Sequence, residues 1–236
     1  MSKRDKPVLV TGGIYSAVDT FETFKKSRKN SLVVASSVYA SDRKVIDISW
    51  LKAAAPVYEI SSDIRDYVIP IVPIVTSDIP NRNMQAFSFK ELSKFDWLKG
   101  QMIYQSFVGK MTSADHVNDN PVYAKGIIFD ASLQHVPKYN IWKVSLLCGF
   151  DRTKDPDLVR DIINKERTGY SMGALVDAFE CSVCKQDQGC RCEKGSVIQG
   201  FLAYQLCKGT NFIEGSSVED PADVTAEGRN LTFKSY

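Results

Sequence analysis

Short apolar segments separated by polar residues and turn formers run along the chain, and this pattern predicts more strands than helices. The β-branched run at residues 67–76 contains Pro70 and Pro73. Because proline cannot donate a backbone hydrogen bond, we expect this run at a sheet edge or across a bulge. The other segments with a strand pattern are residues 7–10, 32–38, 122–129, 140–150, 171–176, 197–206 and 211–218.

One segment has a clear helical pattern. Asp155 can cap a helix whose first turn holds Pro156, and Gly169 is expected to end it. Its apolar stripe consists of Leu158, Val159, Ile162 and Ile163. A more polar, exposed helix is expected at residues 17–29. Together these segments predict a mixed α+β fold that is rich in strands.

The organisation of the chain predicts one domain over residues 1–236, because no internal repeat, low-complexity tract or linker interrupts it. Residues 1–100 carry no clear chemistry. One segment, residues 8–15, partly resembles a dinucleotide-binding motif, but it lacks the third glycine of that motif. Residues 100–230 contain the candidate catalytic groups, and residues 180–195 are a small cysteine-rich insertion.

The overall charge argues against two classes of partner. The 30 Lys and Arg residues nearly balance the 28 Asp and Glu residues, so the net charge of +2 provides no broad basic field for nucleic acid. No apolar run approaches the roughly 20 residues that span a membrane, and no signal-peptide core follows the basic first residues. We therefore expect a protein of a reducing cytoplasm, without nucleic-acid or membrane partners.

Four of the six cysteines form a tight cluster that is typical of a metal site. Cys181, Cys184, Cys190 and Cys192 offer four thiolates, which would close a tetrahedral zinc site and leave no open position for water. The closing pair is separated by a single residue, which is tighter than the common finger spacing, so free or redox-active thiols remain the alternative. Cys148 and Cys207 stand alone and are expected to be buried as small apolar residues.

The segment from Gly169 to Gly173 matches the pattern G-x-S-x-G, in which glycines free the backbone around a nucleophilic serine, here Ser171. A serine hydroxyl needs a base within hydrogen-bond reach. Both histidines precede Ser171, whereas an α/β-hydrolase places its histidine after the nucleophile, so the chain order argues against an esterase of that fold. His116, in a polar segment, is the expected base, and His135 has the surroundings of an ordinary loop residue.

A third group should orient the imidazole of the base, and a carboxylate is the usual choice. Glu214 interrupts the otherwise uncharged strand at residues 211–218, so it either faces solvent or directs its carboxylate at a specific partner. Asp220 and Asp223 lie close enough in sequence to be rivals for this role.

The order His116, Ser171, Glu214 resembles that of the tailed-phage prohead proteases, which are related in fold to the herpesvirus assemblins. Residues 115–130 resemble the histidine block of that family, the helix ending ahead of Ser171 resembles its serine block, and residues 212–226 resemble its late acidic strand with Pro-Ala. The similarity covers about residues 100–230. Gly215 departs from the family pattern, which has an apolar residue after the acid.

The resemblance implies a herpesvirus-protease-like β-barrel core with surrounding helices, and a serine endopeptidase that needs no cofactor for catalysis. His116 would be the general base, Ser171 the nucleophile and Glu214 the orienting acid, where assemblins use a second histidine. The implied substrates are phage scaffold, portal and major capsid precursors, cut inside the assembling prohead in the host cytoplasm, together with the protease itself. A homodimer is also implied.

Two non-enzymatic classes are the alternatives. The chain could be a catalytically silent structural or scaffold protein of the phage head, in which Ser171 and His116 only contribute to packing. A zinc-knuckle module for nucleic acid is disfavoured because Lys and Arg are spread along the chain and do not gather around the cysteines.

Overall fold

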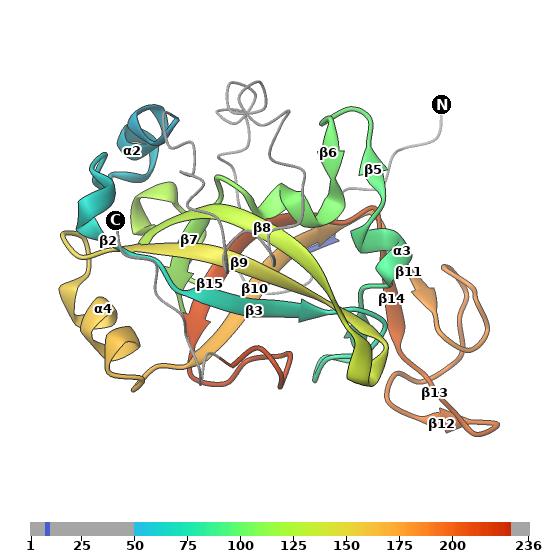
Figure 1. The fold of residues 1–236 in the computed structure, drawn as a ribbon. Helices are drawn as coiled ribbons and strands as arrows, with labels where there is room; N and C mark the ends of the chain where they lie inside the picture. The colour runs from blue at the N-terminus through green and yellow to red at the C-terminus, as the bar shows by residue number, and fades with distance from the viewer. Residues whose placement is uncertain (1–7, 10–49, 228–236) are drawn as a thin grey trace.

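A computed structural model of the chain describes residues 8–9 and 50–227, and it has the strand-rich, mixed α+β fold that the pattern predicts (Figure 1). The helix expected at residues 17–29 and the strand expected at 32–38 lie outside the described residues. Of the strand expected at residues 7–10, the described part, Val8–Leu9, forms strand β1.

The main sheet contains β1, β2 (Tyr67–Val68), β3 (Ile71–Thr76), β7 (Met111–Ala114), β8 (Gly126–Val136), β9 (Ile141–Asp151), β10 (Gly169–Val176) and β15 (Asn211–Val218). The strand order is β1-β10-β15-β7-β8-β9-β2, and β3 pairs with β9. β15 and β7 run parallel, and the neighbours β10 and β15 run antiparallel. Because this path begins at β1 and ends at β2, the described strands do not close, and the predicted closed barrel is not confirmed.

Smaller elements surround this sheet. A second sheet has the order β11 (Ala178–Cys181), β14 (Gln205–Lys208) and β4 (Gln85–Ala86), and two hairpins are formed by β5 (Phe95–Asp96) with β6 (Gln101–Met102) and by β12 (Val197–Ile198) with β13 (Phe201–Leu202). Among residues 50–227 the helices are α2 (Leu51–Tyr58), α3 (Phe89–Leu92) and α4 (Pro156–Ile163), with short 3-10 helices at Ile64–Asp66, Ile103–Phe107, Pro121–Tyr123 and Pro137–Tyr139. Helices α2 and α4 lie at one end of the molecule, and the second sheet with the β12–β13 hairpin lies at the other (Figure 1).

The proline-containing run at residues 67–76 behaves as predicted. It divides into β2 and β3 on either side of Ile69 and Pro70, and the register of β3 against β9 shifts between Pro73 and Val75. Proline has no N–H to donate to a strand ladder, so a break and a bulge are the features that these two prolines favour.

Helix α4 confirms the predicted start and corrects the predicted end. The Asp155 carboxylate accepts a hydrogen bond of 3.0 Å from Leu158 N, and Pro156 occupies the first turn. The helix ends at Ile163, well before Gly169, and Lys165 has a left-handed backbone with φ of 61°. Gly169 instead begins β10, where a Cβ atom would lie 2.5 Å from the carbonyl oxygen of Val218, so this glycine permits a close approach of β15.

Two expected strands had wrong boundaries, and one helix was not predicted. The strand expected at residues 122–129 begins only at Gly126, because Asn120 caps a 3-10 turn at Pro121–Tyr123. The strand expected at residues 197–206 is instead the β12–β13 hairpin followed by β14, since Gln199 and Gly200 both have positive φ and form a tight turn. Helix α2, with buried Leu51 and Tyr58, had no predicted counterpart.

Two apolar clusters cover opposite faces of the main sheet, because successive residues of one strand belong to different clusters. Ile128 joins the cluster that contains Phe212, whereas its neighbour Ile127 joins the cluster around Trp50 and helix α2. Cys148 and Cys207 are both buried in the cluster that contains Phe212, as predicted. Within the described ranges 8–9 and 50–227, none of the helices has the length and hydropathy of a membrane span.

Candidate functional site

Three neighbouring strands bring the candidate residues into two adjacent rows. In the first row, Ser171 on β10 lies opposite Ser216 on β15, which lies beside Ser113 on β7. In the second row, Gly173 lies opposite Glu214. Residues opposite each other share a face, and so do residues two apart on one strand, so these side chains project from the same face of the sheet.

Glu214 is fully buried, with 0% of its surface exposed, which rules out the alternative of a solvent-facing carboxylate. Its Oε2 accepts hydrogen bonds of 3.0 Å from Ser113 Oγ and 2.5 Å from Ser216 Oγ. Its Oε1 lies 2.8 Å from Nδ1 of His116. A buried carboxylate is tolerated only when it is paired and hydrogen-bonded, and these three contacts meet that requirement.

His116 reaches Glu214 from a tight turn that follows β7. Asp115 and His116 have φ of 50° and 59°, and Val117 N donates to Ala114 O at 3.0 Å, as in a type I′ turn. A left-handed backbone at a histidine is uncommon and needs support from its surroundings. Asp115 N gives part of that support by donating to Ser217 O at 3.0 Å.

The charge state of His116 is set by opposing effects. Burial lowers the pKa of the imidazole, whereas the hydrogen bond to Glu214 and the negative charges of Glu214 and Asp115 raise it. The raising effects prevail, so the pKa of His116 lies above its ordinary value of 6.5. The buried carboxylate therefore stabilises the imidazolium form, as an orienting acid does.

The glycines of the G-x-S-x-G segment have a different role from the one expected. Ser171 lies inside the regular strand β10, and neither flanking glycine has a positive φ. A Cβ atom at Gly173 would lie 2.8 Å from Oε1 of Glu214. Gly173 therefore leaves room for the carboxylate that holds His116, and Gly169 leaves room for β15.

Ser171 is 6% exposed, and its neighbours Tyr170 and Met172 belong to the cluster on the opposite face. The serine side chain consequently points to the face that carries Glu214. In the described part of the chain, no hydrogen bond joins Ser171 Oγ to His116. The structure thus brings His116 and Glu214 into direct contact and places Ser171 one row away from Glu214.

Arg167 supports the histidine turn and was not recognised from the sequence. Its guanidinium donates to Ser217 Oγ at 3.1 Å and to Ser217 O at 2.9 Å, and it also pairs with the Asp115 carboxylate. Only 17% of the Arg167 side chain is exposed. The residue lies in the loop between α4 and β10, so one side chain ties the turn to β15 just ahead of Ser171.

The other candidates have different partners. His135 is exposed, with Nε2 at 3.2 Å from Asn140 Oδ1 and its ring against Trp142. Asp220 pairs with the exposed Arg82. Asp223 Oδ2 accepts a hydrogen bond of 2.9 Å from the backbone N–H of Thr76. Glu214 is therefore the carboxylate that meets His116.

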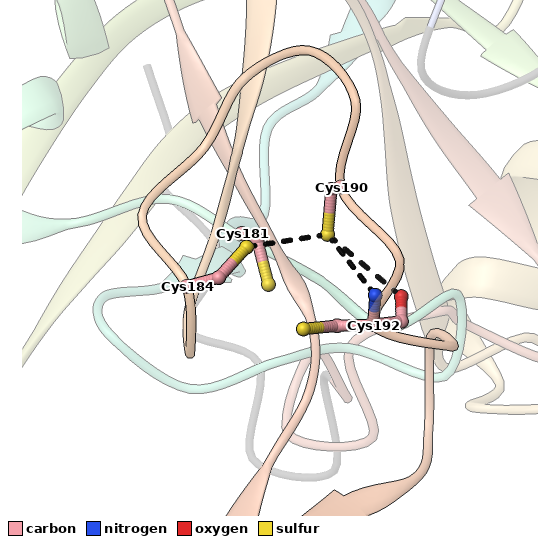
Figure 2. A group of neighbouring side chains, drawn as sticks. All are labelled: Cys181, Cys184, Cys190 and Cys192. Atoms are coloured by element: carbon pink, nitrogen blue, oxygen red, sulfur yellow. Dashed lines mark hydrogen bonds between the residues drawn. The ribbon is translucent and has the colours of Figure 1, made fainter.

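The four clustered cysteines lie at the end of β11 and in the loop that follows it, and their sulfurs point toward one another (Figure 2). All four Sγ atoms lie within 4.8 Å of one another. The group could hold a metal ion: zinc bound at about 2.3 Å by four thiolates separates the sulfurs by roughly 3.8 Å, which these positions nearly provide. The predicted cluster is thus brought together by the fold.

Backbone N–H groups already point at two of these sulfurs. Val183 N donates to Cys181 Sγ and Cys192 N donates to Cys190 Sγ, each at 3.4 Å. Burial raises the pKa of the Cys181 thiol, but hydrogen bonds from Cys184 and Val183 outweigh it and bring the pKa down to about 6. Such stabilisation of the Cys181 thiolate suits a metal ligand. The backbone N–H of Cys192 lowers the pKa of Cys190, but the neighbouring thiols raise it overall, and burial and these thiols raise the pKa of Cys192, as long as no ion is bound.

Comparison of the chain with protein-family models, with curated proteins and with solved structures gave no match.

Proposed function

We propose that the chain is a serine endopeptidase in which Ser171 is the nucleophile, His116 the general base and Glu214 the orienting acid. The observation that carries the proposal is the fully buried Glu214 carboxylate, 2.8 Å from Nδ1 of His116. The contact holds the imidazole in one orientation and stabilises its charged form, which is what the orienting acid of a catalytic base does.

The Glu214 contact fixes the tautomer of the neutral histidine. An ionised carboxylate only accepts hydrogen bonds, so Nδ1 must carry the proton that it donates to Oε1. Nε2 then keeps a lone pair. This is the arrangement in which an imidazole can remove a proton from a serine hydroxyl.

The position of Ser171 relative to Glu214 suits a bridging imidazole. Ser171 and Glu214 are diagonal neighbours across the β10–β15 pair, because Ser171 faces Ser216 and Gly173 faces Glu214. The Cα atoms of diagonal neighbours are about 7–8 Å apart, and an imidazole with a hydrogen bond of about 2.8 Å at each nitrogen joins two oxygens at a similar separation. Hydrogen bonds of catalytic groups are often long or poorly aligned before substrate binds.

The proposed reaction follows from these positions. Ser171 Oγ attacks the carbonyl carbon of a peptide bond while Nε2 of His116 takes its proton, and Glu214 stabilises the imidazolium that forms. His116 then protonates the leaving amine. Water, deprotonated by the same nitrogen, releases the acyl group and restores Ser171.

The biological setting that we propose is the maturation of a phage head, with the herpesvirus-protease-like barrel as the finer description of the fold. This rests on the resemblance of residues 100–230 to prohead proteases, with His116, Ser171 and Glu214 in the family order. The proposed substrates are scaffold, portal and major capsid precursors in the host cytoplasm. We also propose that the four cysteines hold a structural zinc, because four protein ligands leave no open position for chemistry.

The proposal is tested by co-expressing the wild type, Ser171→Ala and His116→Ala with the head precursor proteins of the same virus and measuring intact masses. We expect discrete cleavage by the wild type and none by either variant. Cleavage that persists in Ser171→Ala would place the nucleophile elsewhere. No cleavage by any of the three proteins would favour the silent structural protein.

A further inference from the structure

The connection between β11 and β14 carries the cysteine cluster and has no apolar core of its own. None of residues 182–202, all of which the structure describes, is buried. In the β12–β13 hairpin of this connection, Val197 and Phe201 are 69% and 68% exposed. A two-stranded hairpin without a packed face is at best marginally stable in water. The order of this connection therefore depends strongly on what joins its cysteines.

Two sulfurs of the cluster are already in contact. Cys184 Sγ donates a hydrogen bond of 3.4 Å to Cys190 Sγ (Figure 2). Both residues are exposed, whereas Cys181 is buried and Cys192 is only partly exposed. A disulfide bond is about 2.05 Å long, so the two sulfurs need to approach by roughly 1.4 Å. Residues 185–189, which connect them, are all exposed and lie outside the strands, so this approach meets no packed core.

We propose that Cys184 and Cys190 form a site of reversible oxidation, at which a peroxide converts the two thiolates to a disulfide and zinc leaves the cluster. The loss of zinc rests on the zinc site proposed above, whereas the disulfide does not need it. The exposure of both residues lets a small oxidant reach them without a change in the fold.

The oxidation proceeds in two steps. One thiolate attacks hydrogen peroxide, the O–O bond breaks, and the sulfur becomes a sulfenic acid while hydroxide leaves. The second thiolate attacks that sulfur and displaces a second hydroxide, which forms the S–S bond. Two protons from solvent convert the two hydroxides to water. The cysteine pair thus loses the two electrons that the peroxide gains.

The consequence for the fold follows from the positions of the remaining ligands. Only Cys181 and Cys192 keep thiolates, and two thiolates do not complete a tetrahedral structural site. The disulfide closes the short loop at residues 185–189, so it does not replace the link from Cys181 at the end of β11 to Cys192 ahead of β12. We expect the β12–β13 hairpin to loosen while the main sheet, which has its own apolar clusters, stays folded.

The first test incubates the full chain with zinc, removes the excess, adds hydrogen peroxide and maps disulfides in a trypsin digest by mass spectrometry. Cleavage after Lys185 and Arg191 puts Cys184, Cys190 and Cys192 on three different peptides. We expect a Cys184–Cys190 disulfide and release of about one zinc per chain to a coloured chelator, both reversed by dithiothreitol and fresh zinc. Thiols that persist, or a disulfide between another pair, would overturn the proposal.

Matched variants separate this pair from the other zinc ligands. Cys184→Ser should lower the yield of disulfide at Cys190 at least tenfold. Cys192→Ser removes a zinc ligand but keeps the pair, so the Cys184–Cys190 disulfide should form within twofold of the wild-type yield. The buried Cys148 should stay a thiol in all three proteins and serves as the internal reference. An unchanged yield at Cys190 in Cys184→Ser would contradict the assignment.

Hydrogen exchange measures the structural consequence and needs no substrate. After oxidation we expect the amides of residues 195–204 to exchange about tenfold faster or more, and those of β8 and β9 to keep their rates. Unchanged exchange at residues 195–204 would overturn the release of the hairpin. A chain that binds no zinc but forms the Cys184–Cys190 disulfide supports the oxidation site and overturns only the proposed zinc. The same disulfide in a chain that cleaves nothing supports the oxidation site and counts only against the proposed endopeptidase.

Discussion

Replacing Gly173 by alanine tests whether this glycine makes room for the acid that holds His116. The added Cβ would lie 2.8 Å from Oε1 and 3.0 Å from Cγ of Glu214, and 3.1 Å from Cγ1 of Ile213. Nonbonded heavy atoms rest at about 3.5 Å or more, so the carboxylate must retreat by roughly 0.5 to 0.7 Å. That movement would break its 2.8 Å hydrogen bond to Nδ1 of His116.

The expected losses follow from that displacement. A catalytic group misplaced by about 1 Å costs about 100-fold in rate, so we expect Gly173→Ala to lower kcat/KM by roughly tenfold to 100-fold. The pKa of His116 should fall, because the hydrogen bond to Glu214 is a main cause of its elevation. Overpacking should also lower the free energy of unfolding by about 1–3 kcal/mol.

Titration of the His116 ring signals by NMR, in this variant and in the wild type, measures this effect directly. Gly215→Ala is the matched control, since its Cβ would meet Ile128 at 3.3 Å and Leu146 at 3.5 Å on the other face of β15. We expect this control to keep the pKa of His116. If Gly173→Ala leaves the pKa of His116 unchanged and the cleavage rate within twofold of the wild-type rate, as the control does, the stated role of Gly173 is wrong.

Four further predictions follow from the same structure. Glu214→Gln should lower the pKa of His116, because burial lowers this pKa and the charge of Glu214 no longer raises it. The acid limb of the kcat/KM profile should therefore move to lower pH, and its maximum should fall about 100-fold or more. The His116–Glu214 pair should stabilise the fold fully below pH of about 6.5 and lose this contribution as pH rises through the higher folded pKa, which urea unfolding across pH can measure. Arg167→Gln removes the cation that pairs with Asp115, so the Asp115 carboxylate should raise the pKa of His116 further and move the acid limb of the kcat/KM profile to higher pH. Arg167→Lys keeps the charge, so it should leave the acid limb at the same pH and lower only kcat. Protein purified without chelator should contain about one zinc per chain, and Cys181→Ser should reduce this and lower the Tm, whereas Cys148→Ser should leave the zinc content unchanged.

The local pattern predicted several elements because local chemistry determines them. Asp155 and Pro156 were sufficient to start α4, and the two prolines at 70 and 73 marked a break and a bulge. The end of α4 could not be predicted from Gly169, because this glycine does not end the helix. It leaves room for the carbonyl oxygen of Val218, a residue far away in sequence. The order of the described strands likewise depends on long-range pairing that no local pattern contains.

The candidate site was predictable in its residue types and only partly in its geometry. An isolated acid in an uncharged strand indicated Glu214, and a polar segment indicated His116. The support from Ser113 and Ser216 depends on the register of three strands, which the sequence does not reveal. Arg167 was missed because a single arginine ahead of a strand gives no signal until the turn at Asp115 lies beside it.

The most direct test of the central claim is covalent labelling of the nucleophile, because it needs no known substrate. The wild type should be incubated with a fluorophosphonate, and the adduct should be located by peptide mass spectrometry. We predict one adduct on Ser171, formed at least 100-fold more slowly in His116→Ala and not at all in Ser171→Ala. No adduct, or an adduct on another residue that persists in Ser171→Ala, would contradict the account.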